Sequence, residues 1–271
     1  MRVSMNRIIF IGVWITAASL FAGCSTKPQR PDGGPPPGAV DLSGVNEVTP
    51  KAEPRSKYGN PQSYEVLGKR YYVMQSSTGY KERGIASWYG NKFHGRRTSS
   101  GESYDMYAMT AAHKTLPLPT YVSVTNLRNG KNIVVRVNDR GPFHLNRIID
   151  LSYAAASRLD ILQGGTGLVE VSAIDPADYQ PDRQPPPPAP LARPVTGFFI
   201  QVGAFADLGN ARRLSARLAG LDRSLHISQA VVNGRTLYRV RLGPLLDTEA
   251  ADVLVAALLR RGVSEYRITV D

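Results

Sequence analysis

The chain has 271 residues and a formal net charge of +11. This length suits two modest domains better than a single large core. The basic blocks are short and lack interleaved aromatic residues, which argues against a nucleic-acid partner and favours an anionic cell wall or membrane surface. Because Cys24 is the single cysteine, no intrachain disulfide can form.

The first 23 residues are predicted to be a signal peptide. Two arginines, Arg2 and Arg7, precede an apolar run from Ile8 to Ala22 that is too short to span a bilayer comfortably. The pattern resembles a bacterial lipoprotein signal, although Phe21 stands where such signals usually have leucine. We therefore predict lipidation of Cys24, with several acyl chains that anchor the mature protein to a membrane. The alternative is an ordinary cleaved signal peptide with an incidental cysteine.

Two segments rich in proline divide the remaining chain. Residues 24–63 are also rich in glycine and polar residues, and they are predicted to form a disordered tether because they cannot bury enough apolar surface to fold. Residues 176–195 contain four consecutive prolines (Pro185 to Pro188) and are predicted to be a stiff spacer. The globular domains are therefore expected at residues 64–175 and 196–271.

The first domain is predicted to be mainly β, with short strands separated by glycine and asparagine. Tyr64 to Met74 is expected to form a small hairpin that packs against the domain. The clearest helix runs from Ser152 to Gln163, with Asp150 or Ser152 as its N-cap and Gly164-Gly165 as its stop.

A longer hairpin of this domain ends at a carboxylate. Apolar and polar residues alternate from Tyr121 to Leu127, and the alternation resumes at Ile133. Asn129-Gly130 is predicted to supply the two positive-φ positions of a type I′ turn between these strands. The second strand stops at Asp139, because a Gly-Pro pair then breaks the ladder. The Asp139 carboxylate is therefore left on a rim, where it can face a ligand.

The second domain is predicted to run strand, helix, strand, strand, helix, strand. Phe198 to Phe205 is an apolar strand, and Asn233-Gly234 joins a hairpin. Arg239 and Arg241 alternate with apolar residues, so they are expected to project from an exposed face of the sheet. An ordinary solvated sheet face is the alternative interpretation of these arginines.

Six motifs of the first domain carry a family resemblance. They are G-x-A-S-W-Y-G (Gly84 to Gly90), F-H-G (Phe93 to Gly95), T-S-S-G-E-x-Y-D (Thr98 to Asp105), T-A-A-H-K-T-L-P (Thr110 to Pro117), V-N-D-R-G-P-F (Val137 to Phe143) and R-I-I-D-L-S (Arg147 to Ser152). In these motifs the chain resembles the rare lipoprotein A family of septal-ring lytic transglycosylases. The resemblance implies a double-psi β-barrel that acts as an endolytic peptidoglycan transglycosylase.

Two further motifs, I-Q-V-G-A-F (Ile200 to Phe205) and Y-R-V-R-L-G-P (Tyr238 to Pro244), resemble the SPOR domain. This small module binds peptidoglycan in bacterial division proteins, and the resemblance implies a preference for glycan strands stripped of stem peptides. It also implies substrate contacts by Gln201, Arg239 and Arg241. The expected architecture is a double-psi β-barrel joined by a Pro-rich linker to a small βαββαβ SPOR domain, that is, mainly β plus α+β.

The implied cleavage between MurNAc and GlcNAc needs a proton donor, stabilisation of an oxocarbenium-like centre and a nucleophile. A transglycosylase uses the C6 hydroxyl of the sugar as nucleophile, so one carboxyl group can act as acid and then as base. We assign this role to Asp139, with Glu102 and Asp105 expected to raise its pKa and to stabilise positive charge at the anomeric carbon. His113 is expected to hydrogen-bond Asp139 or a substrate carboxylate, and Arg140 to bind the lactyl carboxylate.

Several of these residues have a structural alternative. Asp105 and Asp150 can simply cap turns or helices, Glu102 can be a solvated loop carboxylate, and His94 is expected to be structural. Asp150 is the next candidate if Asp139 is not the acid. The histidines and carboxylates lack the spacing of a metal site, and no G-x-S-x-G elbow occurs, so neither a metal nor another cofactor is expected.

Two functions of different classes stay open. The first is a lytic transglycosylase that SPOR delivers to peptide-free glycan in the septal wall. The second is a non-catalytic, expansin-like glycan-binding or scaffolding lipoprotein. The joint presence of Glu102, His113 and Asp139 favours the enzyme. The expected partners are denuded glycan strands, the membrane through the N-terminal lipid, and division-site proteins. Ser25, after the cysteine, resembles the signal of lipoproteins sorted to the outer membrane, so a lipid-anchored, periplasm-facing location on the inner face of that membrane is expected. The family resemblance implies that this location is septal.

Overall fold

The structure, a computed structural model, describes residues 33–35, 42, 44–144, 146–179, 197–222 and 224–270. The predicted signal peptide, Cys24 and most of both Pro-rich segments lie outside the described residues. Within the described ranges, no helix has the length and apolar character that crossing a membrane requires. The described residues form two folded bodies, one built on a closed barrel and one on a four-stranded sheet.

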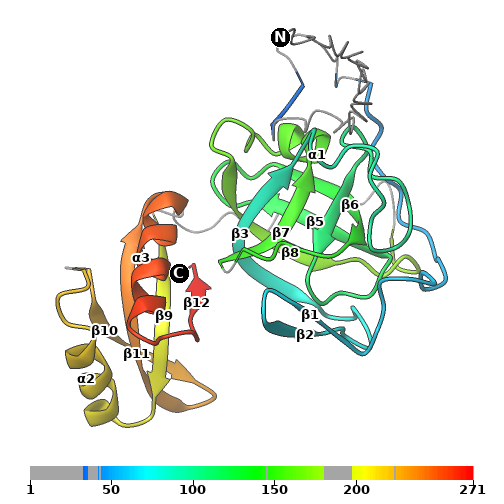
Figure 1. The fold of residues 1–271 in the computed structure, drawn as a ribbon. Helices are drawn as coiled ribbons and strands as arrows, with labels where there is room; N and C mark the ends of the chain where they lie inside the picture. Colours follow the sequence, from blue (N-terminus) through cyan, green and yellow to red (C-terminus); the bar gives the residue numbers. More distant parts are fainter. Residues whose placement is uncertain are drawn as a thin grey trace, which may run out of the picture. The chain divides into compact units, whose positions relative to one another are not determined.

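Six strands of the first body close into a barrel (Figure 1). Their order around the barrel is β3 (Lys81–Tyr89), β7 (Arg147–Ser152), β4 (Thr110–His113), β6 (Asn132–Asp139), β5 (Thr120–Asn126) and β8 (Thr166–Ala173). The pairs β3–β7 and β4–β6 are parallel, and the other four pairs are antiparallel. This mixed six-stranded barrel confirms the predicted fold of the first domain.

The barrel interior is filled by the apolar members of the alternating strands. Val122 and Val124 of β5 and Val135 and Val137 of β6 are all fully buried in one hydrophobic cluster. Burying a valine side chain contributes roughly 1.5–3 kcal/mol relative to leaving it exposed. The period of two that identified these strands in the sequence is therefore also the main source of their stability.

The turn between β5 and β6 differs from the prediction. Gly130 has a φ of 74°, whereas Asn129 is not among the residues with positive φ. The Gly130 N–H donates to the Asn126 carbonyl (2.9 Å), and the Asn129 side chain donates to Leu159 O (3.3 Å). The type I′ prediction is wrong here, because Asn129 is drawn toward the end of α1 (Tyr153–Arg158) and the loop closes over a longer span.

Helix α1 is shorter than predicted. Ser152 is its N-cap and accepts from the Ala155 N–H (3.2 Å), while Asp150 belongs to strand β7. The helix ends at Arg158 and not at Gln163, because Asp160 adopts a left-handed φ of 61°.

Residues 44–62 form a strap that folds onto the barrel, contrary to the prediction of a disordered tether. The Ser56 N–H donates to Leu118 O (2.8 Å), and the Asn60 amide both donates to and accepts from the Leu118 backbone (2.7 and 2.8 Å). Val45 packs against the barrel core, and its carbonyl accepts from Arg158 (2.6 Å). Polar partners on the barrel thus replace the large apolar surface that the strap lacks.

The small hairpin predicted at residues 64–74 is present as β1 (Ser63–Val66) and β2 (Lys69–Tyr72). Tyr64 and Tyr71 stack with ring centroids 5.4 Å apart. Both rings also contact Phe143, at 6.2 and 5.8 Å, in the segment that follows β6. The hairpin therefore packs against the barrel, as predicted, and the structure places it beside the end of β6.

The second body has the predicted βαββαβ order. Its elements are β9 (Phe198–Phe205), α2 (Leu208–Arg217), β10 (His226–Val232), β11 (Arg235–Leu245), α3 (Thr248–Arg260) and β12 (Arg267–Thr269). The strands form an antiparallel sheet in the order β10-β11-β9-β12, against which α2 and α3 pack (Figure 1). Asn233 (φ 50°) and Gly234 (φ 74°) both adopt the left-handed region, as a type I′ turn requires.

Candidate active site

Asp139 stands at the last position of β6, as the sequence predicts. One of its carboxylate oxygens, Oδ1, accepts three hydrogen bonds, from the Ser99 N–H (2.8 Å), the Ser99 hydroxyl (2.6 Å) and the Arg140 N–H (2.7 Å). Ser99 belongs to a loop that crosses the end of the strand and is held there by Ser100 N–H donating to Asn138 O (3.3 Å). The half-buried carboxylate is thus rigidly oriented from one side.

A second carboxyl group, that of Asp150, lies across one strand from Asp139. Ala112 of β4 is in register with Asp139 on one side and with Asp150 on the other. Because neighbouring strands lie roughly 4.8 Å apart, the two aspartate backbones are about 10 Å from one another. Between them, a Cβ added to Gly141 would lie 3.8 Å from Ala112 Cβ and 3.9 Å from Asp150 Oδ2. The chain after Asp139 therefore passes over Ala112 towards Asp150.

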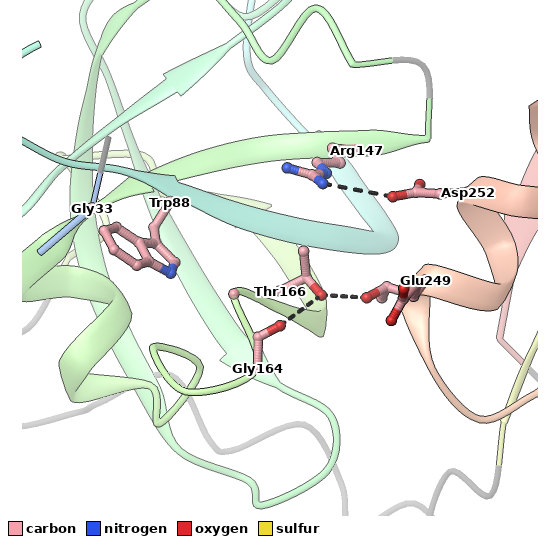
Figure 2. Close-up of a pocket in the computed structure, with 9 residues that line it drawn as sticks. Gly33, Trp88, Arg147, Gly164, Thr166, Glu249 and Asp252 are labelled. Carbon is pink, nitrogen blue, oxygen red and sulfur yellow. Dashed lines mark hydrogen bonds and ion pairs between the residues drawn. The ribbon is translucent and has the colours of Figure 1, made fainter. Parts of the chain in front are cut away.

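Asp150 has surroundings that favour the protonated form of its carboxyl group more than water does. Burial raises its pKa above the ordinary value and outweighs the opposing influences. These influences are the hydrogen bond from the Ser87 hydroxyl to Oδ1 and the positive charges of Arg147, Lys114 and His144. Arg147 begins the strand that carries Asp150, and Figure 2 shows it on the barrel together with Trp88 and Thr166.

A stacked tyrosine pair stands close to both aspartates. Tyr89, the last residue of β3, stacks on Tyr104 with centroids 4.1 Å apart, and the Tyr104 hydroxyl donates to Tyr89 O (2.5 Å). Burial raises the pKa of Tyr89, as do the Tyr104 hydroxyl and the carboxylates of Asp139 and Asp150. The Tyr89 hydroxyl therefore stays protonated. This pair was not predicted from the sequence, although W-Y-G places an aromatic residue at the strand end.

Glu102 does not stand free beside Asp139 as expected. Both of its oxygens accept from Arg136 Nη1 (2.9 Å each), and Oε2 also accepts from the Asn138 amide (2.8 Å). The same guanidinium binds Glu53 of the strap, at 3.0 and 2.9 Å, and this hydrogen bonding lowers the pKa of Glu53. The Glu102 charge is thus balanced by Arg136. The sequence signal for this cluster was Arg136 itself, a lone arginine among the apolar residues of β6.

Asp105 fits its structural alternative. It is exposed, and its Oδ1 accepts from the Tyr107 N–H (2.9 Å), which is the geometry of a turn-capping aspartate. His94 lies 3.7 Å from the same oxygen and accepts from the Met106 N–H (3.2 Å), in keeping with its predicted structural role. In the described part of the chain, neither residue hydrogen-bonds Asp139. No group of three or more His, Cys, Asp or Glu side chains there is arranged to hold a metal ion.

His113 is buried, and its hydrogen bonds run away from Asp139. Its Nε2 lies 2.8 Å from the Tyr80 hydroxyl, and its Nδ1 accepts from the Thr115 and Leu116 N–H groups (3.2 and 3.0 Å). The predicted hydrogen bond to Asp139 is therefore wrong, because both ring nitrogens are engaged elsewhere.

Arg140 is engaged in holding two loops together. Its guanidinium donates to Gly59 O of the strap (2.8 and 2.6 Å) and to Leu116 O (2.5 Å). It also donates to Asn60 Oδ1 (3.2 Å) and to His113 O (3.2 Å). Burial lowers its pKa. The structure thus makes Arg140 a clamp whose donors already meet internal acceptors, which argues against the predicted contact with a lactyl carboxylate.

In the second body, two of the predicted substrate residues, Gln201 and Arg241, belong to one row across the sheet. His226, Arg241, Gln201 and Arg267 are register partners on four successive strands, so they share a face. Arg241 is only 4% exposed, with its guanidinium 4.8 Å from the Phe199 ring centroid. The prediction of an exposed Arg241 is wrong, because Phe199 covers this position from the adjacent strand. Arg239 is half-buried on the same strand.

Comparisons with known proteins match both bodies. A model of the lytic transglycolase family matches residues 81–172, and a model of the SPOR domain matches residues 194–269. The endolytic peptidoglycan transglycosylase RlpA of Pseudomonas aeruginosa strain UCBPP-PA14 is 39% identical, over 84% of this chain and 86% of that protein. The protein of the same name from Vibrio cholerae serotype O1 is 39% identical, over 95% of each.

Among solved structures, the crystal structure of the RlpA SPOR domain from Pseudomonas aeruginosa is 31% identical. The match covers 27% of this chain and 97% of the solved chain, with a TM-score of 0.25. The two family models and the identity over most of the length of the relatives agree with the barrel and the βαββαβ body described above. The chain therefore belongs to the RlpA family of lytic transglycosylases.

Proposed function

We propose that this chain is an endolytic peptidoglycan transglycosylase that cleaves the bond between MurNAc and GlcNAc in glycan strands. The similarity to proteins of that name supplies the class of reaction. The observation that carries the proposal for this chain is the pair of carboxyl groups, Asp139 and Asp150, in register on either side of Ala112.

The two roles that the sequence analysis gave to Asp139 alone are divided between these groups. Asp150, whose pKa is raised by burial, donates its proton to the glycosidic oxygen as the bond from C1 to that oxygen breaks. The C6 hydroxyl of the same MurNAc attacks C1 and closes the anhydro ring, and Asp139 accepts the hydroxyl proton. No water is consumed, and the proton returns from Asp139 to Asp150 through solvent.

The preferred substrate in this proposal is glycan without stem peptides, bound by the SPOR domain near the division septum. The motifs of that domain and the solvent-accessible members of its row of polar and basic side chains, Gln201 and Arg267, support this preference. Arg239 lies on the same strand.

Purified protein incubated with amidase-treated sacculi is expected to release anhydro-ended glycan, detected by mass spectrometry, and to release much less from untreated sacculi. Equal release from both would contradict the preference for denuded strands. Binding to sacculi without any anhydro product would favour the non-catalytic, glycan-binding alternative.

The lipid anchor at Cys24 and the outer-membrane location remain part of this proposal, motivated by the apolar run that precedes the cysteine. Cys24→Ala is expected to lose incorporation of labelled fatty acid and recovery in the membrane fraction. An unlabelled wild type would contradict the anchor and leave the enzymatic proposal intact.

A further inference from the structure

Nδ1 of His113 is fixed as a hydrogen-bond acceptor. The N–H groups of Leu116 (3.0 Å) and Thr115 (3.2 Å) both point at this nitrogen. A neutral imidazole carries one proton, and a nitrogen that accepts two backbone hydrogen bonds does not hold it. The donor pattern therefore assigns the proton to Nε2.

Nε2 in turn has an internal partner. It lies 2.8 Å from the Tyr80 hydroxyl, which donates to Glu82 Oε2 (2.8 Å). The Nε2–H of His113 therefore donates to the Tyr80 hydroxyl, and the Tyr80 hydroxyl donates to the Glu82 carboxylate. The Tyr80 ring also packs edge-on against the imidazole, with centroids 5.2 Å apart.

The surroundings of His113 keep it uncharged. Burial lowers its pKa to about 3, and the nearby charges of Lys114 and Arg140 act in the same direction. Glu82, the one carboxylate in the hydrogen-bonded chain, reaches the ring only through the Tyr80 hydroxyl. A histidine that is neutral and has its accepting nitrogen occupied is poorly suited to take up a proton from a substrate.

A continuous path of contacts leads from His113 to Asp139. His113 holds the turn at residues 115–116, and Leu116 O and His113 O accept from Arg140 Nη1 (2.5 and 3.2 Å). The Arg140 N–H then donates to Asp139 Oδ1 (2.7 Å) and to the Ser99 hydroxyl (3.2 Å). The imidazole thus shapes the turn that holds the residue next to the carboxylate.

We propose that His113, with its tautomer set by Tyr80 and Glu82, is a positioning residue that acts through the 115–116 turn and Arg140 to orient Asp139. The inference rests on the proposed function, because it assigns His113 a place in that reaction. It separates His113 from Asp139 and Asp150, which exchange protons with the substrate.

The test is whether asparagine, which cannot titrate, preserves activity when it replaces His113. In His113→Asn, the side-chain oxygen lies near the position of Nδ1 and can accept from Thr115 and Leu116, whereas His113→Ala leaves both N–H groups without that acceptor. We expect His113→Asn to release anhydro-ended glycan within about tenfold of wild type, with an unchanged pH profile, and His113→Ala to lose about 10²-fold. A loss of about 10²- to 10⁴-fold in His113→Asn, with circular dichroism of the native protein, would overturn the proposal.

Nitrogen chemical shifts of the histidines give a second test that needs no variant at position 113. In the wild type, His113 is expected to show an unprotonated Nδ1 and a protonated Nε2 that do not change between pH 8 and pH 5. Tyr80→Phe should shift Nε2, while the matched control Tyr72→Phe, which removes an exposed hydroxyl, should not.

A midpoint near the ordinary histidine value of about 6.5 would overturn the positioning role. Because this measurement does not depend on turnover, it distinguishes a failure of this inference from a failure of the proposed function.

Discussion

Replacing either Asp139 or Asp150 with asparagine is expected to lower the release of anhydro-ended glycan by about 10²- to 10⁴-fold. Asparagine keeps the size of aspartate and can still accept the hydrogen bonds from Ser99 and Arg140, but it can neither donate nor accept the catalytic proton. The measurement is the initial rate on amidase-treated sacculi, with circular dichroism to confirm folding. Binding to the same sacculi should be unchanged in both variants.

If the two variants lost activity to different extents, the roles of acid and base would have to be reassigned. Wild-type release by Asp139→Asn would exclude Asp139 from the proton transfers, and wild-type release by Asp150→Asn would return both roles to Asp139. Asp105→Asn is the matched control, since Asp105 is an exposed turn carboxylate, and its rate should stay close to wild type.

The pH dependence distinguishes which group is the acid. Activity that needs protonated Asp150 falls as the pH rises through the pKa of Asp150. The Ser87 hydroxyl donates to this carboxyl group and lowers its pKa, so Ser87→Ala removes a group that stabilises the ionised form. The alkaline limb of the profile should therefore move to higher pH in Ser87→Ala. A shift to lower pH, or no shift, would contradict the assignment of Asp150 as acid.

The second large effect concerns stability. Arg136→Gln is expected to lower the free energy of unfolding of the barrel by about 2–4 kcal/mol, because it leaves two partly buried carboxylates, Glu53 and Glu102, without their cation. Urea unfolding followed by tryptophan fluorescence measures this, since Trp88 lies in the barrel and Trp14 lies in the predicted signal peptide.

Two controls accompany Arg136→Gln. Arg70→Gln breaks an exposed pair with Glu65 (3.4 Å) and should cost no more than about 1 kcal/mol. Combining Arg136→Met with Glu53→Gln and Glu102→Gln removes the charges together and should recover part of the loss. If Arg136→Gln were as stable as Arg70→Gln, the ion cluster would not be what holds the strap.

Local patterns predicted the strands and the position of Asp139, because period-two alternation and a terminal Gly-Pro pair are properties of adjacent residues. The turn at Asn233-Gly234 followed the same local rule. At Asn129-Gly130 the rule failed, since the Asn129 side chain contacts Leu159, which lies far along the chain. Local chemistry was decisive wherever no distant partner competed for the same polar groups.

The partners of the charged site residues could not be predicted in this way. Glu102 meets Arg136 and Arg140 meets Gly59 only once the barrel has closed and the strap has docked. The composition of residues 44–62 correctly signals a shortage of apolar surface, but it does not reveal the acceptors and cations that the barrel offers. The pairing of Asp139 with Asp150 across Ala112 likewise follows from strand order, which no motif contains.

The strap gives the barrel a mechanical property. Chain connectivity places residues 44–62 in series between β1 and everything upstream, so a pull on the N-terminal side reaches the strap before the first strand. Among the contacts that would resist the pull are those of Glu53 with Arg136 and of Gly59 with Arg140. These two arginines lie on either side of Asp139 in the sequence, so tension in the chain is delivered to residues that flank the Asp139 carboxylate.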